Sequence, residues 1–163
     1  MDITITYLNM AEFEKIAKNV VAVIERTNTI GITDKDVIAL LRRYVTKASI
    51  YTSMPTSGVD LVLARRNITE MFKDTNSLLK IDCSYSDVDA IASEIISSLE
   101  RESTVAIAFA AAKWRNPQNY VAQGALNMSV AQITESAYAI YLKSIIRSVN
   151  ERIDLKKAVN KEL

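Results

Sequence analysis

The sequence has no histidine, one cysteine, two prolines and three glycines among its 163 residues. Without histidine, catalytic triads with an imidazole base and histidine-ligated metal sites are excluded. The single cysteine, Cys83, excludes an intramolecular disulfide and a cysteine zinc cluster, and the adjacent Asp82 disfavours a reactive thiolate. So few glycines and prolines cannot supply the many tight turns of a β-sandwich or barrel. Long helices with few breaks are the alternative.

Long apolar runs and targeting signals are also missing. The longest uninterrupted apolar run covers residues 105–112, whereas a membrane span needs about 20 residues. Residues 1–8 have neither the basic nor the apolar region of a signal peptide. We therefore expect no membrane partner and an intracellular location, in the cytoplasm or in a virion or other particle. The apolar fraction of 49% and the length are typical of one globular domain.

Apolar residues recur with the helical period along most of the chain, and several stripes begin after a good capping residue, for example after Asn9 and Thr33. Ser84 or Ser86 is expected to cap another helix. The expected helices cover about 9–28, 33–52, 58–73, 86–99, 103–115, 117–126 and 129–150. The helix over 103–115, which is either separate or a continuation of the preceding one, is apolar on nearly all sides and is expected to be central. We predict an all-α protein, a single bundle of five to seven helices.

Three segments do not fit this pattern. Residues 1–8 alternate apolar and polar side chains, which predicts a short extended arm. Residues 74–84 contain the apolar Leu78, Leu79 and Ile81, but without a lasting period, and predict a loop or a short helical turn. Residues 151–163 are strongly charged and predict a fraying C-terminal tail.

The last long helix has two apolar faces. One face carries Ile133, Ala137, Ile140, Tyr141 and Ile145, and the other carries Tyr138, Leu142, Ile146 and Val149. Two such faces indicate either a central helix or a face that waits for a partner chain. The candidate oligomer face combines Tyr138, Leu142 and Ile146 with the arm residues Ile3, Ile5 and Tyr7.

Charge is distributed in blocks although the net charge is only +1. Residues 34–73 carry a net charge of +3, residues 74–104 carry −5 and residues 105–163 carry +4. One interpretation is complementarity within the chain, in which exposed pairs contribute little. A second is head-to-tail assembly of subunits, and a third is a basic track for nucleic acid.

Two groups of cations and aromatics are candidate contacts for nucleic acid or a partner. The first lies on the second and third expected helices: Arg42, Arg43, Lys47, Arg65, Arg66 and Lys73. If the loop between these helices is short, the arginine pairs come near each other and form a fork for phosphate. The alternative is that the arginine stems cover apolar surface while their heads stay in water.

The second group surrounds a break in helix at Pro117: Lys113, Trp114, Arg115, Asn119 and Tyr120. Aromatics interleaved with cations can stack on a base and hold its phosphate, and the same set suits a protein–protein hot spot. The alternative is that Trp114 covers the core and Asn116 caps a helix.

Metal and cofactor motifs do not stand out. Asp34 with Asp36, and Asp87 with Asp89, each lie in the first turn of an expected helix, where the helix dipole favours acids. We therefore expect no metal and no cofactor. Three functions remain: a non-enzymatic assembly or adaptor subunit in a larger complex or homo-oligomer, a small nucleic-acid-binding subunit of a viral coat-like or nucleocapsid-like particle, and an enzyme using carboxylate, lysine or tyrosine. We expect the first and give the third least support, because no paired groups stand at a working spacing.

Overall fold

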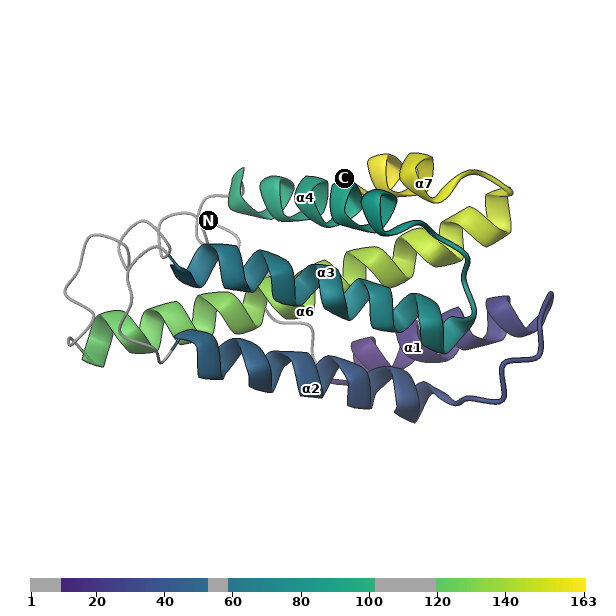
Figure 1. Cartoon of the computed structure of the whole chain (residues 1–163). Coiled ribbons are helices and arrows are strands. Elements are labelled where there is room, and N and C mark those ends of the chain that lie inside the picture. Colours follow the sequence, from purple (N-terminus) through teal and green to yellow (C-terminus); the bar gives the residue numbers. More distant parts are fainter. Residues whose placement is uncertain (1–9, 53–58, 102–119) are drawn as a thin grey trace.

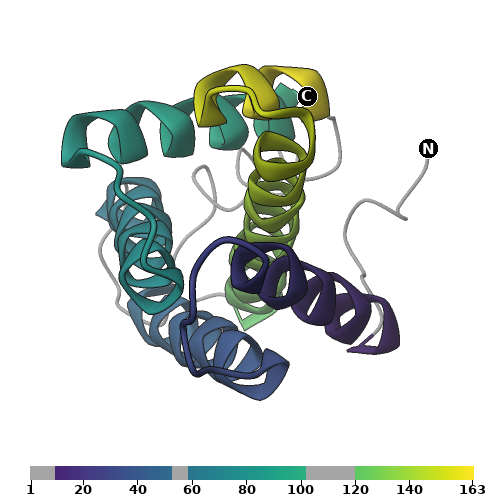
Figure 2. The same cartoon turned by 90° about the vertical axis from the view of Figure 1, so that its right-hand side faces the viewer.

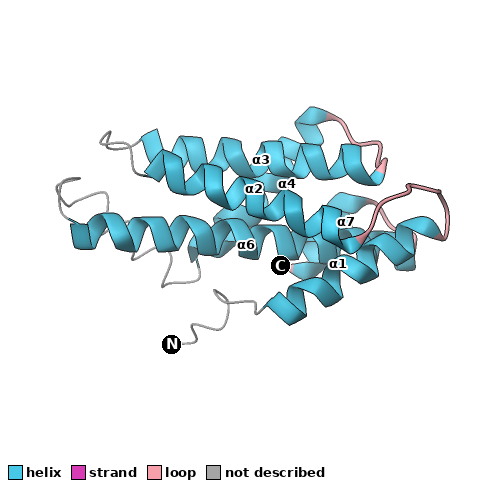
Figure 3. Cartoon of the chain, turned by 90° about the horizontal axis from the view of Figure 1, so that it is seen from below, coloured by secondary structure: helices cyan, strands magenta, loops and turns pink. Residues whose placement is uncertain are grey.

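A computed structural model describes residues 10–52, 59–101 and 120–163, with side chains described for 10–48, 65–99 and 131–163. This part of the chain contains six helices and no strand, which confirms the predicted all-α bundle (Figure 1). The helices are α1 (Met10–Glu25), α2 (Asp34–Thr52), α3 (Val59–Leu79), α4 (Tyr85–Arg101), α6 (Tyr120–Glu151) and α7 (Leu155–Glu162). The three connections within the described residues, 26–33, 80–84 and 152–154, lie at one end of the bundle (Figure 3).

Helix α6 packs against α1, α2, α3, α4 and α7, which are the other helices of the described part. In Figure 2 it lies between α7 (yellow) and α1 (dark purple). Both of its apolar faces contribute buried side chains to the core of a single chain, although Ile140, Ile146 and Val149 are only half-buried. The Tyr141 ring stacks on Phe72 of α3 with centroids 4.0 Å apart, and the Tyr138 ring stacks on Phe13 of α1 at 5.8 Å. The helix expected at the centre, 103–115, lies outside the described residues.

The starts of α2 and α4 follow from their capping residues. The backbone N–H of Thr33 donates to Asp36 Oδ2 at 2.9 Å, which is half of a capping box. Ser84 Oγ accepts a hydrogen bond from the Asp87 backbone N–H at 3.3 Å. Of the two serines considered for this cap, Ser84 is therefore the one that begins α4.

Two boundaries predicted from the sequence are wrong. Helix α3 does not end near residue 73 but continues to Leu79, because Thr75, Asn76 and Leu79 are buried in the bundle. It ends where Lys80 adopts a φ of 55° and the N–H of Ile81 donates to the Asn76 carbonyl at 2.8 Å, a Schellman motif.

The second error concerns α6, which runs without a break from Tyr120 to Glu151. The sequence predicts two helices here, with a new start at Ser129. Residues such as serine and asparagine lower helix stability by less than about 1 kcal/mol each in a helix interior. The packing of α6 against five other helices outweighs that preference.

The charged C-terminal tail is also not a fraying end. Residues 155–162 form α7, which folds back over the end of α6 and beside α4 (Figure 1). Ala158 and Val159 are buried and Leu155 is half-buried, a spacing that places all three on one helix face. The predicted arm over 1–8 and the predicted helix over 103–115 lie outside the described residues. Within the described ranges, no helix is long and apolar enough to cross a membrane.

Candidate functional site

The basic residues of α2 form a small cluster around the buried ring of Tyr44. The Arg43 guanidinium lies 5.2 Å and the Lys47 Nζ lies 4.7 Å from the ring centroid. Arg43 also forms an ion pair with Asp74 of α3 at 2.9 Å, and the Tyr44 hydroxyl donates to the same carboxylate. Burial, together with the bond to Asp74 and its charge, raises the pKa of Tyr44 to about 12. The cluster therefore joins α2 to α3, and its cations are partly engaged within the chain.

The arginine pairs of α2 and α3 do not form a shared phosphate fork through Arg43 and Arg65. Arg43 reaches Asp74, whereas Arg65 donates to Ser93 of α4. Residues 65 and 74 are nine positions apart on α3, which corresponds to about 13 Å of helix. Arg42 and Arg66 are exposed on the outer surface.

Lys73 is placed beside an exposed aromatic ring that the sequence analysis did not single out. Its Nζ lies 5.4 Å from the centroid of Tyr85, whose side chain is 52% exposed. Tyr85 is the first residue of α4, and only the packing of α3 against α4 brings it to Lys73. An exposed ring next to a cation can stack on an aromatic ligand.

The acidic character of α4 is partly neutralised within the chain. Asp87 forms an ion pair with Lys156 of α7 at 2.8 Å, and this contact, followed by the bond to Ser84, lowers the pKa of the Asp87 carboxyl. The first interpretation of the charge blocks thus has a direct contact in its favour. Among the described residues, no group of three or more acidic or cysteine side chains could hold a metal ion.

Part of the candidate oligomer face is buried, which corrects the assignment of Tyr138 and Leu142 to that face. Tyr138 and Leu142 have no exposed surface, because α1, α2 and α3 cover the second face of α6. The Tyr138 hydroxyl lies 3.0 Å from Thr75 Oγ1 and donates to the Val37 carbonyl at 3.4 Å. Neither Tyr138 nor Leu142 can contact another subunit in this fold. Ile146 is half-buried.

The remaining candidate contacts lie outside the described residues. This applies to Ile3, Ile5 and Tyr7 of the arm and to the segment from Lys113 to Asn119. The backbone of Tyr120 begins α6, but its side chain is not described.

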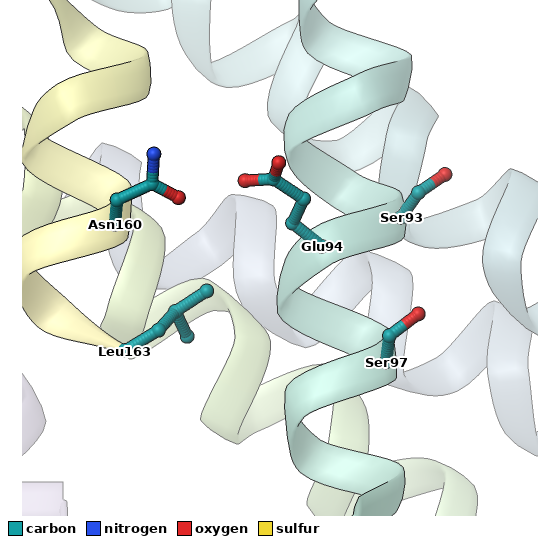
Figure 4. A pocket seen from close by; sticks show the side chains of 5 residues that line it. All are labelled: Ser93, Glu94, Ser97, Asn160 and Leu163. Atoms are coloured by element: carbon teal, nitrogen blue, oxygen red, sulfur yellow. The ribbon is translucent and has the colours of Figure 1, made fainter.

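In the described part of the chain, two surface clefts open beside α7. The first, of about 450 Å³, lies between α4 and α7. Figure 4 shows Glu94 directed toward α7, whereas the hydroxyls of Ser93 and Ser97 point away from it. A catalytic site requires polar groups that converge on one point, and the polar groups of this cleft do not converge.

The second cleft, of about 360 Å³, is lined by α1, α6 and α7. Ile16 of α1 and Ile146 of α6 are half-buried within it. Its polar lining includes Asn19 of α1, Lys143 and Asn150 of α6 and Glu162 of α7. The sequence analysis missed this cleft, apart from Ile146, because it forms only when α7 folds back. The apolar spacing of Leu155, Ala158 and Val159 was the available signal for that helix.

A scan against protein-family models and searches of curated proteins and of solved structures found no match to this chain.

Proposed function

We propose that this chain is a non-enzymatic subunit that acts through protein–protein contacts, in a homo-oligomer or a larger complex. The observation that carries the proposal is the cleft between α1, α6 and α7. Half-buried Ile16 and Ile146 lie in it beside charged and amide side chains such as Lys143 and Asn150. An apolar centre with a polar rim is the usual composition of a protein interface. This role fits the expected intracellular or particle-bound location.

The buried polar groups of the described core support the same role, because they serve the fold. The Tyr138 and Tyr141 hydroxyls bond to neighbouring helices, and burial raises the pKa of both. Raised pKa values keep these phenols neutral, so they are poor general bases near neutral pH. The polar and charged groups that a partner could contact are then those of exposed side chains.

The test is the mass of the chain in solution, measured by light scattering over a range of concentrations. We expect a mass above 18.2 kDa that rises with concentration. The double variant Lys143→Glu with Asn19→Arg should lower the association constant by about tenfold, because it reverses one charge and adds another at the rim of the cleft. Lys35→Glu is the matched control, since it reverses an exposed charge on α2 away from the cleft, and it should leave the mass unchanged. A strict 18.2 kDa monomer at high concentration would contradict self-assembly.

A second candidate function is nucleic-acid binding. The specific observation in its favour is the exposed ring of Tyr85 on α4 beside Lys73 on α3. Two further exposed cations lie on the neighbouring helices, Arg42 on α2 and Arg66 on α3. Nucleic-acid binding predicts co-purifying nucleic acid and an affinity that falls steeply with salt. Arg42→Glu with Arg66→Glu should then reduce both the absorbance ratio at 260 and 280 nm and the salt slope.

A further inference from the structure

The break between α6 and α7 lacks the residues that normally impose one. The chain contains neither glycine nor proline after Gly124. Arg152 nevertheless adopts a φ of 56°, in the left-handed region that favours glycine, and the Ile153 N–H donates to the Ser148 carbonyl at 3.1 Å. A residue with a Cβ pays a conformational cost in this position. The Ser148 hydroxyl donates to the Ile153 carbonyl at 2.6 Å and supports the turn, but neither glycine nor proline is present to end α6 here.

The start of α7 is also weakly specified. Asp154 is its N-cap residue, but the Asp154 side chain makes no capping hydrogen bond. The residues on both sides of the break, such as Glu151 and Leu155, are good helix formers. The residues at the break therefore do not prevent α6 and α7 from joining into one helix.

Tertiary contacts hold α7 against the bundle instead. Its charged side chains pair with a seat made of α4 and α6: Lys156 with Asp87 at 2.8 Å, Lys161 with Glu151 at 2.9 Å and Glu162 with Arg147 at 2.9 Å. These side chains are 20–52% exposed, so salt screens the pairs. Ala158 and Val159 are the buried part of the contact.

We propose that two copies of this chain exchange α7. In the exchanged dimer, the turn at 152–154 straightens, α6 and α7 become one helix, and α7 of each copy occupies the seat of the other. Every contact of α7 is then made again between copies, while the left-handed turn at Arg152 is lost. Short hinge loops under strain favour such swapping.

The geometry of the bundle permits this exchange. Glu162 reaches back to Arg147 while Lys161 pairs with Glu151, so α7 runs back along the end of α6. That end lies at the edge of the molecule, where a straight continuation would project outward (Figure 1). Two straightened helices can then lie side by side about a two-fold axis. This inference deepens the proposed function, on which it rests, by naming the partner as a second copy and the contact as α7.

The first experiment compares two substitutions at one exposed position. Arg152→Gly favours the left-handed turn and disfavours a continuous helix, whereas Arg152→Ala has the opposite preferences. Both remove the same charge. Light scattering should show a dimer of twice 18.2 kDa whose association constant is at least about tenfold higher for Arg152→Ala than for Arg152→Gly. Equal association constants would overturn the exchange, and if both variants still assembled, the proposed function would stand.

The second experiment tests contact between copies directly. In Asp87→Lys, and separately in Lys156→Asp, the charges between α7 and its own seat repel each other. When the two variants are mixed, each α7 finds an opposite charge only on the other chain. We expect the mixture to form one-to-one heterodimers in preference to homodimers, because only the exchanged heterodimer restores two pairs of opposite charge, and about 1 M salt should weaken this preference.

The outcomes separate this inference from the proposed function. A mixture that forms no heterodimer overturns the exchange. If the wild-type chain forms dimers that neither the Arg152 substitutions nor the charge exchange alters, self-assembly uses another surface and the exchange is wrong. If wild type and mixture both stay at 18.2 kDa, the exchange and self-assembly fail together.

Discussion

Single side chains in the described core combine apolar packing with a satisfied polar group. The Tyr141 ring lies parallel to Phe72, with 7° between their planes, and its hydroxyl donates to Asn76 Oδ1. Buried hydroxyls lower stability unless they are hydrogen-bonded, and a partner on another helix makes that bond depend on correct packing. These residues therefore specify which helices meet as well as stabilising the core.

Glu135 is a residue whose charge should lower stability. It is half-buried on α6, and burial raises the pKa of its carboxyl. Because the pKa of Glu135 is higher in the folded than in the unfolded state, this carboxyl adds to the free energy of unfolding at pH values below its ordinary pKa. That contribution is lost as the pH rises through the pKa of the folded state. Glu135→Gln, which removes the charge, should raise Tm at about pH 7 and change it little at about pH 4. An equal effect at both pH values would contradict this prediction.

Single residues also show the limit of sequence patterns. The alternation of apolar faces on the last helix identified Tyr138 and Leu142 as prominent, but it could not decide between a core and an oligomer face. Burial by α1, α2 and α3 decides this, since the same apolar side chain suits either environment. The sequence pattern missed Tyr85 and Asn19, because the contacts of each depend on a neighbouring helix: α3 for Tyr85, and α6 and α7 for Asn19.

Whole helices differ in how far local signals specify their ends. The start of α4 is local, because Ser84 caps it. The end of α3 and the break before α7 are not, because Lys80 and Arg152 occupy left-handed positions without glycine. A capping side chain acts within one turn, whereas a helix end without such a signal depends on packing.

The cap of α4 gives a prediction with a neighbouring control. Ser84→Ala removes the hydrogen bond to the Asp87 N–H and should lower the free energy of unfolding by about 1 kcal/mol. Ser86→Ala, two residues later, keeps that bond and should have a clearly smaller effect. The measurement is the urea unfolding curve of each variant. Equal losses in the two variants would mean that the cap does not stabilise α4.

At the scale of the whole molecule, Tyr138 connects four helices. From α6, its ring stacks on Phe13 of α1, while its hydroxyl contacts Thr75 of α3 and the Val37 carbonyl of α2. A side chain in this position makes the stability of the helices interdependent. It also converts the second apolar face of α6 into part of the core.

Substitution of Tyr138 should therefore affect stability and not assembly. Tyr138→Ala should lower the free energy of unfolding by about 3–5 kcal/mol through the cavity that it leaves. Tyr138→Phe keeps the ring and should cost about 1–2 kcal/mol through the lost hydrogen bonds. Urea unfolding measures both values. If either variant lowered the solution mass while leaving stability unchanged, Tyr138 would belong to an oligomer face after all.

The sequence by itself determined the fold class, because the scarcity of glycine and proline and the helical period of apolar residues act locally. It also located the start of α2 and narrowed the start of α4 to Ser84 or Ser86, because a capping side chain needs only its own helix. Tertiary structure alone decided that α3 extends to Leu79, that α6 is continuous, and that residues 155–162 fold back as α7. Each of these depends on burial or ion pairs between residues on different parts of the chain, which the local sequence does not specify, although the apolar spacing of Leu155, Ala158 and Val159 was a partial signal for α7.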